Sequence, residues 1–380
     1  MSRSKVTVRD VALQANVSNG TVSRVLNEHQ GVANELRIRV LDAAAALGYA
    51  RTPRGSRPPI RGLQNIGFLL TLPHLGDQRD LMAPFWAHIL QGAEVEARRR
   101  GAKVTYCSLS GQGVKTSDVL ARVRELRLDA TMLVGTPSRT VVEAVERLGI
   151  PVVVLDSVLD PGLDRRGHDA VVPNYSDGTQ MVTQELLTAG HRNVAFIGGP
   201  RAQRSAVRNA VPAIEMRARG FREALAYAGI TFGPNMIVDS DLTQSGGYAA
   251  TKLLMERSPE TTALVCANDA LASGAMRALR DLGHAVPRGV SVVGGSDELG
   301  EHTFPPLTSF QLDQPALGAV AVQQLFRRAG DPGSAAVTTL LPVELVRRQS
   351  VAPVPTAMDE MAAHSTSDPS TNPPTLQGVK

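Results

Sequence analysis

The sequence predicts an α/β protein in which a small all-α module at the N-terminus precedes two lobes with doubly wound parallel sheets. Three observations predict this fold. The first 50 residues hold three short helical periods and no strand pattern. Beyond residue 65, apolar strand-like runs alternate with amphipathic stretches, which is typical of parallel sheets covered by helices on both faces. Seven such runs would overfill one sheet, so two lobes with a cleft between them are favoured.

The N-terminal module begins with two short helices joined by a small polar turn. Thr7 and Asp10 have the spacing of a capping box, which predicts a first helix that ends near Asn16. Ser18 is a candidate N-cap for the second helix, and a third helix is expected over residues 35–47. The pattern predicts a helix-turn-helix whose second helix enters the major groove of DNA, with a plain three-helix bundle as the alternative.

Charge along the chain favours the same conclusion. Residues 1–65 hold ten basic and four acidic residues, a net charge of +6, which leaves −2 for the remaining 315 residues. A basic module on a near-neutral body is typical of a nucleic-acid binder, because phosphate neutralisation releases counterions. The candidate DNA-binding residues lie at the start of the first helix, on or beside the second helix, and in the linker that follows the module. They are Thr7, Ser18, Asn19, Thr21, Ser23, Arg24, Asn27, Arg54 and Arg57.

These residues have different expected roles. Arg24 is expected to contact a guanine and Asn19 an adenine, the pairings that their geometry favours. The hydroxyl side chains and Asn27 are expected to bind phosphates. In the proline-rich linker, arginines recur every third residue, which predicts an extended arm along the minor groove; a flexible tether is the alternative.

The body of the chain supplies the expected strands and helices. One amphipathic helix is expected over residues 85–99, where its basic C-terminal end suits the helix dipole. The seven apolar runs that predict strands cover residues 65–71, 102–109, 130–135, 151–156, 193–199, 262–267 and 290–295. The last 30 residues are rich in Ser, Thr and Pro and lack an apolar period, which predicts a disordered tail over residues 351–380.

Longer stretches of sequence resemble one family. "TVRDVALQANVSNGTVSRVLN", followed by "VLDAAAALGY", is similar to the DNA-binding headpiece of the LacI/GalR family of transcriptional regulators. "LLTAGHRNVAFIGGP" and "CANDALASGAMRALRDLGHAVPRGVSVVGGSDE" resemble the family's effector domain, which is periplasmic-binding-protein-like. The resemblance implies a headpiece over residues 1–49, a hinge linker over 50–64, and an effector-binding and dimerisation domain over 65–350. It assigns residues 65–160 and 297–325 to one lobe, and 161–296 and 326–350 to the other.

An effector site is expected where strands of both lobes end at the cleft. The candidate effector-binding residues combine charged and amide groups with an aromatic pair: Phe85, Trp86, Asp156, Arg217, Asn268 and Asp269. Two of them have structural alternatives, since Asp269 can cap the next helix and Trp86 can belong to the core. Ser296 stands where relatives commonly carry an aspartate, so the identity of the effector stays open.

The resemblance implies a DNA-binding transcriptional regulator, a repressor, that is controlled by a small effector such as a sugar. Specificity in a genome requires paired headpieces, so we expect a homodimer on a palindromic double-stranded operator. The sequence has no signal peptide and no apolar run of membrane-spanning length, which predicts a cytoplasmic protein without a membrane partner. Common enzyme motifs and metal-ligand spacings are missing, so no enzyme activity, cofactor or metal is expected. The alternatives are a cytoplasmic sugar-binding protein and an α/β enzyme, neither of which binds DNA.

Overall fold

The computed structural model of the chain describes residues 7–26, 32–47, 62–71, 84–109, 115–157, 168–199 and 212–354. The chain divides into two units, Met1–Pro59 and Ile60–Lys380, and this division falls inside the predicted linker. Three of the candidate DNA-binding residues, Asn27, Arg54 and Arg57, lie outside the described residues. So does residue range 355–380, which holds most of the predicted tail.

The N-terminal unit contains three helices, as the sequence predicts: α1 (Val8–Ala15), α2 (Asn19–Leu26) and α3 (Asn34–Ala46). Its core consists of small apolar side chains from all three helices: Val11, Ala12, Ala15, Val22, Val25, Val40, Ala43 and Ala44. Arg39 of α3 donates a hydrogen bond to the carbonyl of Ala15 at 2.7 Å, which satisfies an otherwise open acceptor at the end of α1. The third helix therefore fixes the first helix by both packing and hydrogen bonding.

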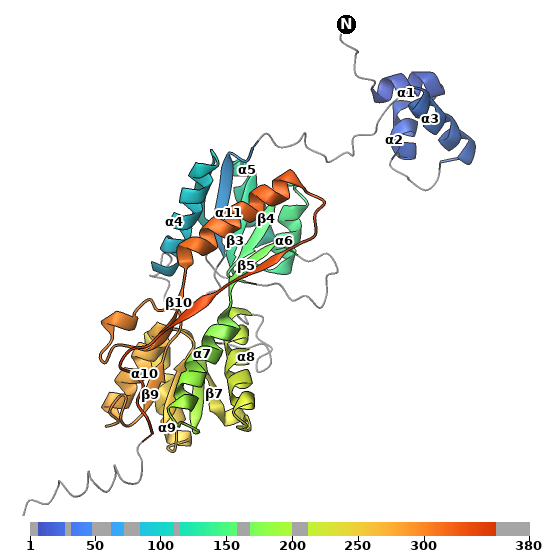
Figure 1. The fold of residues 1–380 in the computed structure, drawn as a ribbon. Helices are drawn as coiled ribbons and strands as arrows, with labels where there is room; N and C mark the ends of the chain where they lie inside the picture. The colour runs from blue at the N-terminus through green and yellow to red at the C-terminus, as the bar shows by residue number, and fades with distance from the viewer. Residues whose placement is uncertain are drawn as a thin grey trace, which may run out of the picture. The chain divides into compact units, whose positions relative to one another are not determined.

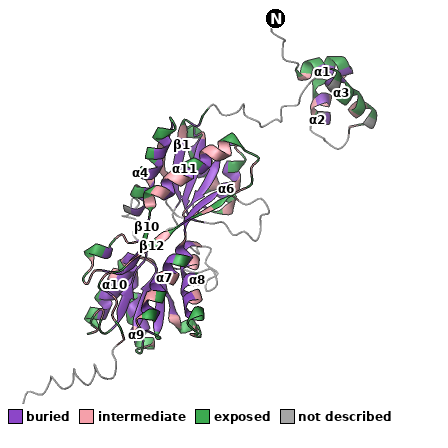
Figure 2. Cartoon of the chain, viewed as in Figure 1, coloured by how far each residue is buried: buried purple, intermediate pink, exposed green. Residues whose placement is uncertain are grey.

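The first lobe of the second unit is a six-stranded parallel sheet with the order β11-β5-β4-β3-β1-β2 (Figure 1). Its strands are β1 (Asn65–Thr71), β2 (Lys103–Ser108), β3 (Ala130–Gly135), β4 (Val152–Leu155), β5 (Ala170–Pro173) and β11 (Thr338–Leu341). Its helices are α4 (Pro84–Arg99), α5 (Thr116–Glu125), α6 (Arg139–Glu146) and α11 (Gln314–Gly330). The four inner strands, β1, β3, β4 and β5, are buried between the helices, as Figure 2 shows, and this explains their apolar sequences, whereas the edge strands β2 and β11 are partly exposed.

The second lobe has a four-stranded parallel sheet of order β7-β6-β8-β9 and an antiparallel pair, β10 with β12. The strands are β6 (Val194–Gly198), β7 (Ile237–Asp239), β8 (Ala263–Cys266), β9 (Ser291–Val293), β10 (Ser309–Leu312) and β12 (Val343–Val346). The helices are α7 (Tyr175–Thr188), α8 (Pro212–Tyr227), α9 (Gln244–Arg257), α10 (Asp269–Asp281) and two 3₁₀ turns, Pro234–Met236 and Gly300–His302. All seven strands predicted from apolar runs are present, and two lobes with parallel sheets are confirmed.

The predicted division between the lobes is wrong in detail. The chain passes between lobes after β5, after β10 and between β11 and β12, so residues 297–313 belong to the second lobe and 326–341 to the first. Close packing of α11 against α4 explains this placement. A Cβ atom on Gly318 would lie 2.0 Å from the carbonyl oxygen of Ile89, and one on Gly92 would lie 1.9 Å from that of Pro315. Only glycine allows the two backbones to approach so closely, which fixes α11 in the first lobe.

Each parallel sheet has two distinct edges. The carboxyl ends of the first-lobe strands, including the end of β4 at Asp156, form one edge, where the chain also passes to α7 of the second lobe. The amino ends form the opposite edge, where β1 starts at Asn65, directly after Gln64. No helix in the part of the chain that the structure describes is long and apolar enough to cross a membrane.

Candidate DNA-binding and effector sites

Hydrogen bonds at the helix ends of the N-terminal unit match the predicted caps. The backbone nitrogen of Asp10 donates to Thr7 Oγ1 at 3.4 Å, and that of Thr7 donates to Asp10 Oδ2 at 2.7 Å, so the predicted capping box is confirmed. Asn16 then adopts a left-handed conformation with φ of 51° and ends α1. Ser18 Oγ accepts a hydrogen bond from the backbone nitrogen of Thr21 at 3.1 Å, which caps the start of α2.

The second helix, α2, carries polar side chains that lie outside the hydrophobic core of the N-terminal unit. Asn19 and Arg24, the candidate base-reading residues, are exposed, whereas Thr21 and Ser23 are half-buried. The hydroxyls of Ser18 and Thr21 also lie 2.9 Å from each other. The hydroxyls of Thr7 and Ser18, two of the predicted phosphate-binding groups, therefore cap helices. Contact of these hydroxyls with DNA stays a prediction.

Three side chains, those of Asp156, Tyr175 and Arg217, lie together where the chain passes from the first lobe to the second. Asp156 follows β4 and has a left-handed φ of 65°, which turns the chain sharply at the carboxyl edge. Its Oδ1 accepts a hydrogen bond from the hydroxyl of Tyr175, the first residue of α7. The guanidinium carbon of Arg217, on α8, lies 3.6 Å from the centroid of the Tyr175 ring. Two predicted residues, Asp156 and Arg217, are thus joined through a tyrosine that the sequence analysis did not name.

Arg217 is a buried arginine that has no carboxylate partner among the residues that the structure describes. Its exposure is 6%, its Nε has no hydrogen-bond partner, and among the described residues it forms no ion pair within 4 Å. Its Nη1 donates to the carbonyl of Ala213 over a long distance, 3.4 Å. A buried guanidinium with open donors is suited to bind ligand oxygen atoms, since leaving it unpaired is costly.

Two carboxyl groups near Arg217 are hard to ionise. Burial raises the pKa of Asp156 to about 6, although the Tyr175 hydroxyl and the charge of Arg217 both oppose the rise. Burial also raises the pKa of Glu298 to about 7, and the nearby Asp269 carboxylate adds to this rise, while Ser296 and Arg217 oppose it. The site therefore combines one fixed positive charge with two carboxyls that release their protons close to neutral pH.

Asn268 and Asp269 have extensive structural contacts in the second lobe. Asn268 Oδ1 caps α10 by accepting from the backbone nitrogen of Leu271 at 2.8 Å. Asp269 accepts hydrogen bonds from the backbone nitrogens of Gly295 and Leu299, each at 3.0 Å, and from Ser309 Oγ at 2.8 Å. Asp269 thus fixes the loop after β9, while Asn268 is the cap of α10. Effector contact by these two residues stays a prediction.

Two residues of the loop after β9, Ser296 and Asp297, lie next to the predicted site. Ser296 is buried and its hydroxyl donates to the carbonyl of Gly295. Asp297 forms an ion pair with Arg348, with Nη2 and Oδ2 3.0 Å apart. The Asp297 carboxylate is therefore already paired with an arginine of the fold.

Phe85 and Trp86 lie at the start of α4 with 9% exposure each. Their ring centroids are 4.7 Å apart at 81°, an edge-to-face pair within the core of the effector domain. Both rings belong to the carboxyl edge of the first lobe, because α4 follows β1 there. The core interpretation of Trp86 thus has direct support, and its contact with a ligand stays a prediction. No group of three or more potential metal ligands occurs among the described residues.

Sequence reasoning missed Tyr175, Glu298 and Phe310. Tyr175 comes two residues after β5, whose sequence AVVP holds only three consecutive apolar residues before a proline. Glu298 lies two residues beyond Ser296, and Phe310 lies on β10, 5.9 Å from the Arg217 guanidinium carbon. A signal was present for the first, because recognition of residues 170–173 as a strand would have placed Tyr175 at its carboxyl end.

Comparisons with protein families match both units. Residues 7–52 match the family described as bacterial regulatory proteins, lacI family. Residues 183–351 match a periplasmic binding protein-like domain. The first match covers the helix-turn-helix, and the second covers most of the second lobe together with α11 and β11.

Curated relatives and solved structures cover nearly the whole chain. The chain is 28% identical over 346 residues to the ribose operon repressor of Haemophilus influenzae, with 91% of this chain and 98% of that protein covered. It is 29% identical over 350 residues to the HTH-type transcriptional repressor PurR of Aliivibrio fischeri, with the same coverage. Among structures, the regulator CelR in complex with cellobiose has a TM-score of 0.67 at 27% identity, covering 91% of this chain and 99% of that one. The lac repressor dimer bound to operator and the anti-inducer ONPF has a TM-score of 0.64 at 26% identity, with the same coverage.

Proposed function

Since the chain belongs to the LacI/GalR family of bacterial transcriptional regulators, we propose that it is a homodimeric, DNA-binding repressor controlled by a small molecule. The observation that carries the proposal is the combination of two sites in one chain. A capped helix-turn-helix exposes Asn19 and Arg24, and a separate two-lobed domain joins Asp156, Tyr175 and Arg217 between its lobes.

The proposed DNA contacts follow from the chemistry of α2. Arg24 reads a guanine and Asn19 an adenine in the major groove, while the hydroxyls around them bind phosphates. One such helix reads only a few base pairs, so two copies on a palindrome are required for specificity in a genome. The lac repressor structure similar to this chain is a dimer bound to operator, which supports the homodimer.

The proposed effector is a sugar or a chemically related metabolite. Arg217 offers fixed donors, Asp156 offers an acceptor, and the Tyr175 and Phe310 rings provide apolar surface near the guanidinium. These are the groups that pair with hydroxyls and cover the C–H face of a sugar ring. Similar proteins are named for cellobiose and ribose, which supports this ligand class.

The competing functions have less support. Relatives that span nearly the whole chain are named as repressors, so this is a regulator and not an enzyme. A sugar carrier without DNA binding would not need the N-terminal unit that matches the lacI family. A bacterial repressor meets its operator in the cytoplasm, where we place this protein.

Binding of the full chain to random-sequence duplexes, followed by selection of the bound sequences, tests the DNA function. We expect a palindromic preference, and Arg24→Ala should change the preferred base at one position in each half-site. A decrease in binding free energy of about 1–3 kcal/mol is expected for the preferred sequence only. If wild type shows no salt-sensitive DNA binding, the proposal of a repressor is wrong.

A thermal-shift screen against sugars and sugar phosphates tests the effector. A ligand of the folded state raises the melting temperature, because it binds the native protein and not the unfolded chain. Arg217→Ala should abolish that shift while leaving DNA binding intact. Arg219→Ala is the matched control, since Arg219 lies on the same helix but is exposed and paired with Glu223. An unchanged ligand shift in Arg217→Ala would place the effector elsewhere.

A further inference from the structure

The amino edge of the first-lobe sheet, where the chain arrives from the linker, is here called the linker edge. The backbone nitrogens of Gln64 and Asn65 donate to Asp129 Oδ2 at 3.1 and 3.0 Å. Lys103 lies beside Asn65 in the sheet register, and the Asn65 amide donates to the carbonyl of Leu126 at 2.8 Å. The starts of β1 and β2 and the end of α5 therefore meet where the described part of this unit begins.

Basic residues gather at this edge from several elements. The helices α4, α5, α6 and α11 all end there, because each runs back from the carboxyl edge. Arg100 connects two of them, with its guanidinium carbon 5.1 Å from the Phe326 ring centroid. The basic residues of the linker edge are Arg98, Arg99, Arg100, Lys103, Arg122, Arg124, Arg127, Arg147, Arg327 and Arg328.

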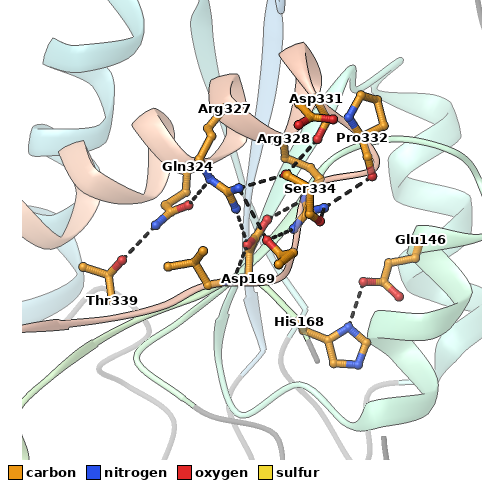
Figure 3. Close-up of polar contacts among 12 residues, drawn as sticks. Glu146, His168, Asp169, Gln324, Arg327, Arg328, Asp331, Pro332, Ser334 and Thr339 are labelled. Carbon is orange, nitrogen blue, oxygen red and sulfur yellow. Dashed lines mark hydrogen bonds and ion pairs between the residues drawn. The ribbon is translucent and has the colours of Figure 1, made fainter. Parts of the chain in front are cut away.

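Two of these arginines are fully engaged within the fold. Arg327 and Arg328 hold the buried carboxylate of Asp169 from both sides, with Arg328 Nε 2.7 Å from Oδ2 (Figure 3). Arg328 Nη1 also donates to the carbonyl of Ser334 at 2.6 Å. This network joins α11 to the start of β5 and the loop before β11. The Asp169 carboxylate neutralises one of the two positive charges, and backbone carbonyls accept further hydrogen bonds from Arg328, so the network stabilises the fold.

Acidic residues neutralise several other arginines of the linker edge. Arg99 and Arg100 bind the buried Glu96 at 3.1 and 2.6 Å. Arg122 pairs with Glu125 at 2.8 Å. Glu96 and Glu125 are therefore already engaged with neighbouring arginines.

Four basic residues remain exposed and form no ion pair with the residues that the structure describes: Arg98, Lys103, Arg124 and Arg127. Favourable interaction with a helix dipole accounts for Arg98 and Arg124, which lie in the last turns of α4 and α5. It does not account for Lys103 at the start of a strand, or for Arg127, which has a left-handed φ of 49°. Four such cations on one edge form a surface suited to an extended anion.

We propose that the linker edge binds the phosphate backbone of DNA that flanks the operator half-site. The inference rests on the proposed function, which supplies the DNA. Residues 48–61 are all that separates α3 and its following turn from this edge, and fourteen residues span at most about 50 Å. The length of the linker permits flanking DNA to contact the linker edge, and each phosphate bound there would add affinity without sequence preference.

The experiment compares two variants of the full chain that carry the same change in net charge. The test variant is Arg98→Gln/Lys103→Gln/Arg124→Gln. The control is Arg219→Gln/Arg257→Gln/Arg288→Gln, which removes three exposed arginines of the second lobe. Melting temperatures verify that both variants fold. Binding is measured against salt on the selected operator site alone and on the same site extended by about one helical turn, ~10 bp, at each end.

Wild type and control should bind the extended duplex more tightly and with a steeper dependence of log K on log[salt]. The test variant should lack this advantage, with the slope reduced by about 0.9 for each phosphate that it no longer neutralises, and should bind the short site as wild type does. If the test variant keeps the slope and affinity of the control on the extended duplex, the linker edge does not bind DNA, and the repressor function stands. Failure of wild type to bind either duplex would instead overturn the function itself.

Discussion

Replacement of Glu298 by glutamine should stabilise the protein above neutral pH and have no effect in acid. A pKa raised from 4.5 to about 7 means that ionising this carboxyl costs about 3 kcal/mol more in the folded protein than in the unfolded chain. The cost is absent below pH 4.5, grows as pH rises to about 7, and is complete above it. Glutamine keeps the size of the side chain and a carbonyl oxygen that accepts hydrogen bonds, but it cannot ionise. At pH 8 we therefore expect about 3 kcal/mol of added stability, as the pKa shift implies.

Thermal unfolding of wild type, Glu298→Gln and Glu256→Gln at pH values from 4 to 8 tests this reasoning. Glu256 is an exposed glutamate on α9 and serves as the control for removal of a negative charge. The melting temperature of Glu298→Gln should equal that of wild type near pH 4 and exceed it by roughly 6–12 °C at pH 8. The control should stay close to wild type throughout. A difference between Glu298→Gln and wild type that does not change with pH would show that burial of the carboxylate is not the cause.

Three further changes test other parts of the fold. Gly20→Ala should stabilise α2 by about 1 kcal/mol, because an added Cβ meets only Ser18 Oγ, at 3.6 Å. Amide hydrogen exchange in α2 measures this change: slower exchange would support the predicted stabilisation, and faster exchange would contradict it. Asp169→Ala should cost at least ~2 kcal/mol in urea unfolding because two arginines lose a buried partner, whereas Glu143→Gln, which breaks an exposed pair, should change stability by less than ~1 kcal/mol. Gly318→Ala should cost about 1–3 kcal/mol in the same assay through its clash with the α4 backbone; unchanged stability would show that the helices separate freely.

Much of the fold is predictable from local signals. The capping box at Thr7 and the seven apolar runs are properties of short segments, and the structure contains both. The division between lobes is different, because it depends on which distant strand a segment pairs with. β5 and β11 have only four residues each and pair with one another across the sequence. Their length is not the obstacle, since β4 and β8 have four residues and β9 has three, and all three are predicted from apolar runs. The partner of each strand is what local sequence does not specify, so the division implied by the resemblance places the crossings between lobes one element away from their true positions.

The candidate effector site shows the same limit. Asp156 and Arg217 are visible as polar residues after a strand and within a helix, and the structure joins them. Tyr175, which connects them, was missed because its preceding strand has only three consecutive apolar residues before a proline. For Asn268 and Asp269 the residue type is informative, but their hydrogen-bond partners are distant loops that no local pattern specifies.

The pairing of β5 with β11 determines when each lobe can form during translation. Ala170 lies beside Thr338 in the sheet, so the edge of the first lobe stays open while the ribosome adds the 167 residues between them, 171–337. During that time β5 presents an unpaired apolar edge, which is a site for aggregation. A nascent chain released before residue 338 would lack both the last strand of the first lobe and the β12 partner of β10, even though all of α7 to α10 would be complete. The lobes therefore cannot be exchanged between relatives by joining the chain at a single point.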